Sequence, residues 1–347
     1  MTQLLPAHFI RTFMLLNAAV LVILLFTAIS VGSVSIPVNE IVQAIWQSCC
    51  TTAETETNTH HIIITLVRAP RAVVGACVGA ALAVAGVQMQ GLFKNPLASP
   101  SIVGISSGGA LGAVLALATG AATYSILAIP SFAFLGAFMT LLIIYALATQ
   151  RGHTAITTLL LAGVALSALL SALISFVITL SSIDLEISRE MIFWLMGGLG
   201  SRTWLHVYII VPCFAIGFML SLYFHRELDI MLMGQETAHS LGVDVQKVKW
   251  LLLTGTALLT GAAVAVSGVI GFVGLVIPHI TRLLIGPKHR YLLPCSALIG
   301  ANFILLMDML ARTARPPEEI SLGVLTALVG APFFLYLLVH HRKEVGY

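Results

Sequence analysis

Long apolar stretches separated by short polar breaks constrain this sequence more than any other feature. A bilayer core takes about 20 mostly apolar residues per helical crossing. Hydrophobic residues make up 59% of the 347 residues and charged residues only 9%, whereas a soluble domain carries roughly 25% charged residues. The stretches fall near 13–31, 62–92, 102–120, 126–149, 155–181, 204–224, 250–277, 278–286, 291–311 and 321–339. The sequence therefore predicts an all-α polytopic membrane protein, a single domain over residues 1–347 with about ten transmembrane helices.

The stretch at 278–286 decides whether the number of crossings is odd or even. It is too short to span a bilayer alone and begins at Pro278, so it either extends the preceding helix or forms a broken span. Lys and Arg collect in short cytoplasmic loops, and ten crossings with both termini in the cytoplasm place every Lys on that side. Six arginines then lie outside: Arg68, Arg71, Arg189, Arg202, Arg312 and Arg315. Because guanidinium groups bind carboxylates in bidentate fashion, this outer set indicates carboxylate or anion partners.

The first apolar stretch, Phe13 to Ile29, follows Arg11 and resembles a signal peptide in position. It is longer than the usual hydrophobic region of a signal peptide, no small-x-small cleavage site follows it, and more membrane helices come after it. We therefore expect a retained first helix.

Small residues recur at four-residue spacing within two of the apolar stretches. Gly75 and Gly79 form one such pair, and Gly104, Gly108 and Gly112 form a longer series. In lipid, this spacing lets helix backbones approach closely, and close packing drives association there. The pattern predicts a tightly packed bundle and carries no functional signal by itself.

Two polar stretches interrupt the apolar pattern. The first, 33–61, is expected outside and contains an amphipathic piece over 37–47 that would rest at the membrane interface. Its apolar face would consist of Val38, Ile41, Val42 and Ile45. The second, 225–249, is the largest cytoplasmic break. Within it, 235–241 is expected to form a short helix closed by Gly242, and Asp244 is expected to cap the next helix.

Several kinds of catalytic chemistry are missing from the sequence. There is no G-x-x-x-x-G-K-[ST] loop and no Gly-Lys pair, so another chain would have to bind ATP if ATP drives this protein. No hydrolase motif is present, and we expect neither enzymatic activity nor a cofactor in this chain. A proton-coupled carrier would bury carboxylates at mid-membrane, and almost none occur here, which weakens that alternative.

A few ionisable residues within the apolar stretches need an explanation. Asp308 precedes Arg312 by four residues, so the two share a helix face and are predicted to form an ion pair. His279 is interpreted as a hydrogen-bonded packing residue at a helix start, with a metal-chelate ligand as the rival interpretation. Cys49 and Cys50 lie near His60 and His61, but an ordinary surface loop is favoured over a metal site, so no resident metal is expected.

Three long blocks resemble the FecCD family, the permeases of ABC importers for iron siderophores, haem and vitamin B12. The first is RAPRAVVGACVGAALAVAGVQMQGLFKNPLASPSIVG over 68–104. The second joins GQETAHSLGVDVQKVK over 234–249 to SGVIGFVGLVIPHITRLLIGPKHR over 267–290. The third is EISLGVLTALVGAPFFLYLL over 319–338. With matching helix spacing, the resemblance covers nearly the whole chain after residue 12.

The resemblance implies a type II ABC importer permease fold with ten helices in the cell inner membrane. It implies a second permease copy or a paralogous permease, with the translocation path between the two lined by the fifth and tenth helices, here 155–181 and 321–339. It also implies cytoplasmic ABC ATPase subunits below and a periplasmic or lipid-anchored substrate-binding protein above. The cargo would be an iron siderophore, or else haem or vitamin B12, and no nucleic acid partner is expected.

The resemblance also assigns roles to particular residues. Arg68 and Arg71 match the paired arginines that meet acidic residues of the binding protein, and Arg312 lies in the corresponding region after the ninth helix. The segment that docks into the ATPase matches the cytoplasmic break. Its coupling residues would be Gln235, Glu236, Ala238, His239, Leu241 and Gly242, with Ala238 and Leu241 on one helical face.

Two hypotheses from other classes stay open on the sequence alone. One is an ion-coupled secondary transporter that works without an ATPase, and the other is a membrane scaffold that transports nothing. Neighbouring reading frames for a Walker-type ATPase and a secreted binding protein would favour the importer over both.

Overall fold

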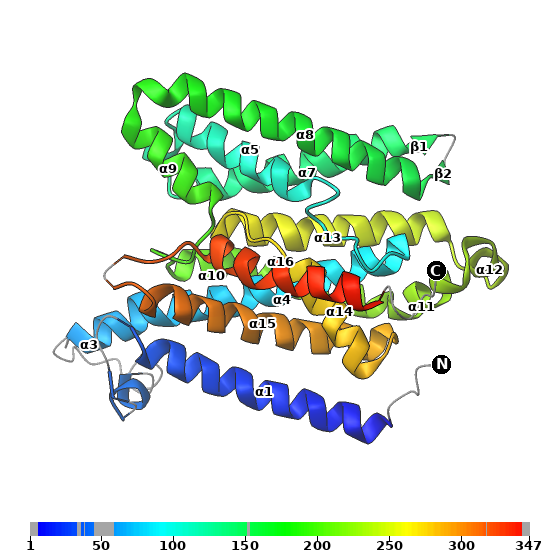
Figure 1. The fold of residues 1–347 in the computed structure, drawn as a ribbon, viewed down its shortest axis with the longest axis horizontal. Helices are drawn as coiled ribbons and strands as arrows, with labels where there is room; N and C mark the ends of the chain where they lie inside the picture. Colours follow the sequence, from blue (N-terminus) through cyan, green and yellow to red (C-terminus); the bar gives the residue numbers. More distant parts are fainter. Residues whose placement is uncertain are drawn as a thin grey trace.

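The computed structural model describes residues 6–32, 36–37, 39–44, 59–150, 153–316 and 318–341, and these are almost entirely helical. The long helices run side by side between the two ends of a bundle (Figure 1). In chain order the helices are α1 (Ala7–Ser30), α3 (Thr59–Ile62), the π-helical η1 (Ile63–Arg68), α4 (Ala69–Phe93), α5 (Ile105–Ala118), α6 (Ala121–Tyr124), α7 (Ala128–Ala148), α8 (Ile156–Leu180), the 3-10 turn η2 (Ser181–Ile183), α9 (Leu185–Leu195), α10 (Trp204–Tyr223), α11 (His225–Met233), α12 (Gln235–Ser240), α13 (Val245–Ser267), α14 (Val273–Ile285), α15 (His289–Thr313) and α16 (Leu322–His341). Two short strands, β1 (Thr149–Gln150) and β2 (His153–Thr154), pair as an antiparallel hairpin between α7 and α8.

Seven helical segments of the described chain are long and apolar enough to cross a membrane. They are α1, the continuous segment Thr59–Phe93, α7, α8, α10, α13 and α15. Three shorter apolar helices, α5, α14 and the described part of α16, accompany them. Together the seven and the three correspond to the ten predicted stretches, so the all-α polytopic fold is confirmed.

The break between α13 and α14 lies elsewhere than the sequence predicted. The sequence placed it at Pro278, but α13 already ends at Ser267 and α14 begins at Val273, which leaves Pro278 inside α14. Gly268 follows α13 with φ +69°, a left-handed conformation that glycine adopts without steric strain. The chain therefore turns at the glycine-containing segment 268–272, and the proline is tolerated within the next helix.

Close helix approach explains the spaced small residues. A Cβ atom on Gly79 of α4 would collide with the carbonyl oxygen of Gly300 on α15, and one on Gly112 of α5 would collide with that of Phe132 on α7. Only glycine permits these two helix pairs to pack at this distance. The predicted role of the glycine spacing in a tightly packed bundle is thus confirmed.

The core is built around α4 and α13, whose membrane-spanning parts are the most buried of the seven. One cluster of buried side chains joins these two helices to α10, α14 and α15, and a second joins α4 and α13 to α5 and α7. Within this core Gln88 bridges two hydroxyl groups: its amide donates to Ser221 on α10, and Thr256 on α13 donates to its carbonyl oxygen at 2.6 Å. Hydrogen bonds of this kind hold helices together in lipid.

The described part of the polar stretch before α3 packs against the bundle. Residues 39–44 are helical, and Ile41 and Ala44 are buried with residues of α1, η1 and α4, while Val42 is exposed. Val38 and Ile45 of the predicted interfacial face lie outside the described residues. The predicted single face is therefore wrong for Ile41 and Val42, because the helix buries Ile41 in a protein contact.

The bundle has two distinct ends. α12, the start of α1 and the end of α16 lie at one end, and α3 and α9 lie at the other (Figure 1). We call them the α12 end and the arginine end, the latter after Arg68 and Arg71 at the start of α4. Residues 225–249 thus lie at the same end as the start of α1 and the end of α16, with α9 at the opposite end, and the predicted cytoplasmic side of both termini stays a prediction.

Candidate functional site

Arg71 holds three segments together at the arginine end. Its guanidinium donates to Asp308 of α15, with Nη2 at 2.8 Å and Nε at 3.0 Å from Oδ1. It also grips Glu319, just before α16, with Nη1 at 2.7 Å from Oε1 and Nη2 at 2.8 Å from Oε2. The hydrogen bonds from Arg71 hold the pKa of the Glu319 carboxyl below its usual range. Two carboxylates that follow 237 and 248 residues later in the chain are therefore tied to the start of α4.

Arg68 and Arg312 donate hydrogen bonds to the C-terminal end of α1. Arg68 Nη1 donates to the carbonyl oxygens of Ile29 and Ser30, both at 2.8 Å, and Arg312 Nη2 donates to that of Ala28 at 3.0 Å. These are carbonyls of the last helical turn, which lack partners within the helix. Arg312 Nε also lies 3.3 Å from Asp308 Oδ2, which confirms the predicted ion pair.

The three arginines assigned to binding-protein docking are thus engaged within the chain. Arg68 is 6% exposed and Arg71 is 8% exposed. An incoming carboxylate would reach either guanidinium only by displacing an internal acceptor. Docking through Arg68, Arg71 and Arg312 stays a prediction. Within the chain, these arginines connect α1, α4, α15 and the start of α16.

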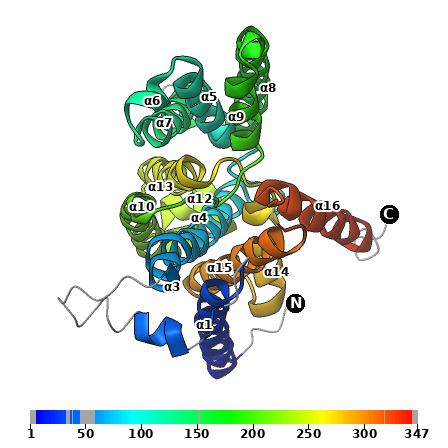
Figure 2. The ribbon, with the colours of Figure 1, turned by 90° about the vertical axis from the view of Figure 1, so that its left-hand side faces the viewer.

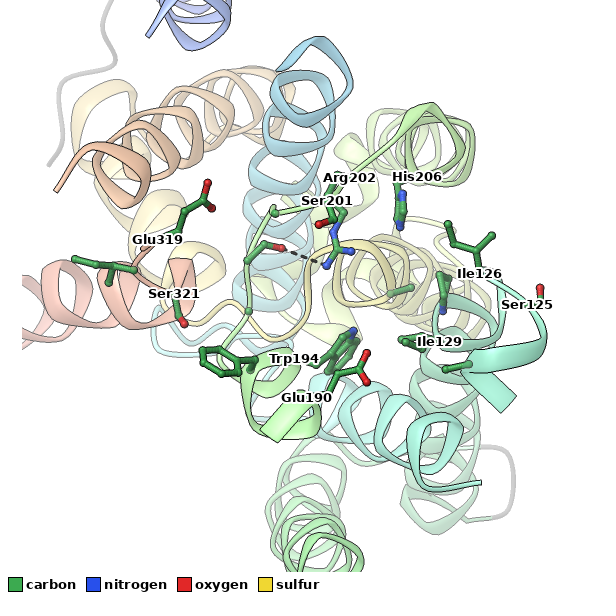
Figure 3. Close-up of a pocket in the computed structure, with 18 residues that line it drawn as sticks. Ser125, Ile126, Ile129, Glu190, Trp194, Ser201, Arg202, His206, Glu319 and Ser321 are labelled. Atoms are coloured by element: carbon green, nitrogen blue, oxygen red, sulfur yellow. Dashed lines mark hydrogen bonds between the residues drawn. The ribbon is translucent and has the colours of Figure 1, made fainter. Parts of the chain in front are cut away.

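A cavity of about 570 Å³ lies beside this network (Figure 3). Its walls come from α6, α7, α9, the turn between α9 and α10, and the segment before α16. Trp194, Phe193, Ile126 and Ile129 are among its apolar lining residues. Its polar lining residues include Glu190, Arg202, His206 and Glu319.

Arg202 also lines this cavity, and the sequence had assigned it no role of its own. Its Nη2 makes one long hydrogen bond, 3.5 Å to the carbonyl oxygen of Gly198, and its buried Nε has no hydrogen-bond partner among the described residues. Burial, together with the charge of Arg71, lowers the pKa of Arg202 to about 10. The only sequence signal was its membership of the outer arginine set.

Glycines at the end of α9 and the start of α16 let the two backbones meet directly. The amides of Leu322 and Gly323 donate to the carbonyls of Gly197 and Met196 at 3.0 and 3.1 Å, and the amide of Gly198 donates to Ser267 of α13 at 2.8 Å. A Cβ atom on Gly323 would collide with the Met196 carbonyl oxygen. Backbone contacts therefore link α9, the end of α13 and the start of α16.

At the α12 end, the predicted short helix is present. α12 ends at Ser240 with Leu241 as its C-cap, Gly242 follows with φ +84°, and Asp244 accepts the Lys247 amide at 3.1 Å to cap α13. The helix and both capping predictions are therefore confirmed.

The predicted shared face of Ala238 and Leu241 is wrong. Ala238 is completely buried against the bundle, whereas Leu241 is 62% exposed. Leu241 lies beyond the last helical residue, so the three-residue spacing no longer places it on the face of Ala238. The exposed residues of the segment include Gln235, Glu236, His239, Leu241 and Gly242, together with Met233, which is 74% exposed.

Lys249 connects α12 to the chain that enters α8. Its side chain is buried, and Nζ donates to the Gln235 side-chain oxygen and to the Thr154 carbonyl oxygen, both at 3.1 Å. Gln246 accepts the Thr154 amide at 3.2 Å. α12 is thus joined to the residues immediately before α8.

α8 and α16 lie at the edge of the bundle (Figure 2). The membrane-spanning part of α8 is the least buried of the seven. One of its exposed faces carries hydroxyl groups at Ser171, Ser175 and Thr179, which recur every fourth residue. By contrast, the exposed residues of α7 after Ser131 are all apolar and include Phe132, Leu135, Met139, Ile143 and Leu147.

The structure bears on the two predictions about histidines, the loop near His60 and the position of His279. His60 Nδ1 lies 2.6 Å from a Glu40 carboxylate oxygen, while Cys49 and Cys50 lie outside the described residues. His279 lies inside α14 rather than at a helix start, because α14 begins six residues earlier. Among the residues that the structure describes, no group of three or more His, Cys, Asp or Glu side chains could hold a metal ion.

Comparison with known proteins gives matches over most of the chain. The FecCD transport family matches residues 20–340. The chain is 46% identical to the cobalamin import system permease protein BtuC of Halobacterium salinarum, over 81% of this chain and 74% of that protein. It is 44% identical to the hemin transport system permease protein HmuU of Yersinia pestis, over 80% and 83%. An inward-facing structure assigned to a metal-chelate type ABC transporter superposes with a TM-score of 0.83 at 32% identity, over 95% of this chain and 99% of that one.

Proposed function

The chain belongs to the FecCD transport family, and from this premise we propose how it works as the membrane-spanning permease subunit of an ABC importer. A permease needs a path for cargo, a surface for the ATPase and a surface for the substrate-binding protein. The bundle offers a candidate for each, at its edge and at its two ends. An ion-coupled carrier or a scaffold is no longer needed to explain the sequence.

We propose that the α12 end faces the cytoplasm and the arginine end faces outward. Every Lys with a described position in a loop or helix end, such as Lys94, Lys247 and Lys288, then lies on the cytoplasmic side, as the distribution of positive charge in membrane proteins predicts. α12 and its exposed neighbours Met233 and Leu241 would meet the ATPase. The arginine end would meet the substrate-binding protein.

The observation that carries the proposed path is the hydroxyl face of α8. Ser175 donates to the Ser171 carbonyl at 3.1 Å and Thr179 donates to the Ser175 carbonyl at 2.8 Å, so these hydroxyls need no second helix of the same chain. An exposed polar face on a membrane helix suits water or a partner better than lipid. We propose that a second permease copy or a paralogous permease stands opposite, with the path between α8 and α16 of the two chains.

Cysteine accessibility tests this path. With the five native cysteines replaced by Ser, we expect Ser175→Cys to react with a water-soluble, membrane-impermeant thiol reagent in the assembled importer. Met139→Cys on α7 is the matched control, because Met139 is also exposed in the isolated chain but lies among exposed apolar residues. Equal protection of both positions would contradict a water-filled path along α8.

The proposed cargo is a metal chelate, with iron siderophores favoured, then haem and cobalamin. The support is the family itself and the names of the relatives, since the small, hydroxyl and apolar side chains proposed to line the path do not specify one ligand. Uptake of radiolabelled ferric siderophores, haem and cobalamin by cells that produce the importer should give accumulation of one class above the background of cells lacking the permease. Accumulation of none of them would contradict the cargo proposal.

A further inference from the structure

Positive charge exceeds negative charge in the network at the arginine end. Arg68, Arg71, Arg202 and Arg312 lie within electrostatic reach of one another, while Asp308 and Glu319 are the carboxylates that pair with them. Arg71 forms ion pairs with both carboxylates, and Arg312 forms a second ion pair with Asp308. Arg68 donates hydrogen bonds to backbone carbonyl oxygens. Arg202 is left without a carboxylate partner among the described residues.

The unsatisfied guanidinium faces the cavity. Figure 3 shows Arg202 pointing between the walls that carry Glu319 and Glu190, with only the long bond to the Gly198 carbonyl drawn to it. Its Nε is buried and lacks a partner in the described part of the chain. The side chain as a whole is half-buried and has no ion-pair partner in the described part of the chain, so an anion that enters the cavity would supply one. Glu319 is bound by Arg71 through both oxygens and makes no hydrogen bond to Arg202 among the described residues.

The geometry points to a binding site for a small organic anion in this cavity, with a carboxylate of the ligand on Arg202 and its apolar body against Trp194 and Phe193. A volume of about 570 Å³ lies in the range of small-molecule sites and far exceeds what one acidic side chain of a partner protein would fill. Glu190 also lines the cavity, but it is exposed to solvent, which screens its repulsion of an anion on Arg202. The inference rests on the proposed function in one respect, because it treats the anion as cargo entering from outside.

Binding to the purified importer complex tests this site. Hemin is the probe, because it carries carboxylates on a large apolar ring, and its dimethyl ester is the matched probe without free carboxylates. Equilibrium binding in lipid nanodiscs at pH 7, corrected with empty nanodiscs, should show hemin bound at least tenfold more tightly than the ester, since charge-assisted hydrogen bonds are the stronger kind.

Variants assign the effect to Arg202. Arg202→Gln should lower hemin affinity about tenfold or more and remove the preference over the ester. Arg315→Gln removes the same charge at the same end, but Arg315 is exposed and lies outside the cavity, so its affinity should match wild type. Equal binding of hemin and its ester by wild type, or equal losses in the two variants, would overturn the site.

The comparison of hemin with its ester uses wild-type protein, so it decides the question even if Arg202→Gln does not fold. The outcome is also separate from the cargo proposal. Hemin could bind through Arg202 while cells accumulate no metal chelate, which would sink the proposed cargo alone. Uptake of a chelate without carboxylate-dependent binding would sink the anion site alone.

Discussion

Cells that produce the Leu241→Asp variant are expected to lose most chelate uptake while the permease stays inserted in the membrane. Leu241 is 62% exposed at the end of α12, and burying a leucine side chain in a partner is worth roughly 1.5–3 kcal/mol. A carboxylate there would have to be desolvated without a designed partner. We expect either loss of the ATPase from the purified complex or ATP hydrolysis that no longer drives uptake.

The structure sharpens this prediction by removing Ala238 from the contact. Ala238 belongs to the buried core beside Val243 and Val248, so the apolar surface offered to a partner is Leu241 with Met233. Lys249 then joins α12 to Thr154 and so to the start of α8. Movement of α12 would reach the proposed path through this joint.

The control for Leu241→Asp is Ile183→Asp, which makes the same kind of change at an exposed apolar residue of the arginine end. This variant should retain ATPase binding. Expression, membrane insertion and thermal unfolding are compared with wild type for both variants. Wild-type uptake by Leu241→Asp at equal expression would rule out the docking assignment, and failure of Leu241→Asp to insert would show that Leu241 has a structural role.

The Arg71→Met variant is expected to be the least stable of the single variants considered. Removing one partner of a buried ion pair costs about 3 kcal/mol or more, because the other charge stays buried. Here Asp308 is buried and would keep only Arg312, and Glu319 would lose both of its hydrogen bonds. In detergent, the thermal unfolding midpoint should fall by several degrees, and the segment before α16 should become more accessible to protease.

Arg315→Gln is the matched control for Arg71→Met. Arg315 and Glu318 lie 3.7 Å apart and are 77% and 74% exposed, and exposed pairs contribute about 0–1 kcal/mol. The control should therefore unfold within about a degree or two of wild type. An unchanged midpoint for Arg71→Met would mean that Arg71 does not stabilise the arginine end. Docking of the substrate-binding protein would then be the better explanation for Arg71.

The sequence alone was enough to predict the class of fold, because apolar stretches of bilayer length leave a chain few alternatives to a helical bundle. It also determined the short helix α12, since Gly242 and Asp244 carry their capping signals locally. The Asp308–Arg312 pair followed from four-residue spacing alone. Each of these depends on neighbours within one or two helical turns.

The side chains that meet across the bundle could be identified only from the folded structure. Arg71 and Asp308 are 237 residues apart, and no local pattern indicated that the arginine would be satisfied within the chain. The same holds for Ala238, which packing of α12 against the bundle turned inward. Arg202 became a candidate ligand residue because the other arginines had been given partners, and such an assignment needs all of their positions at once.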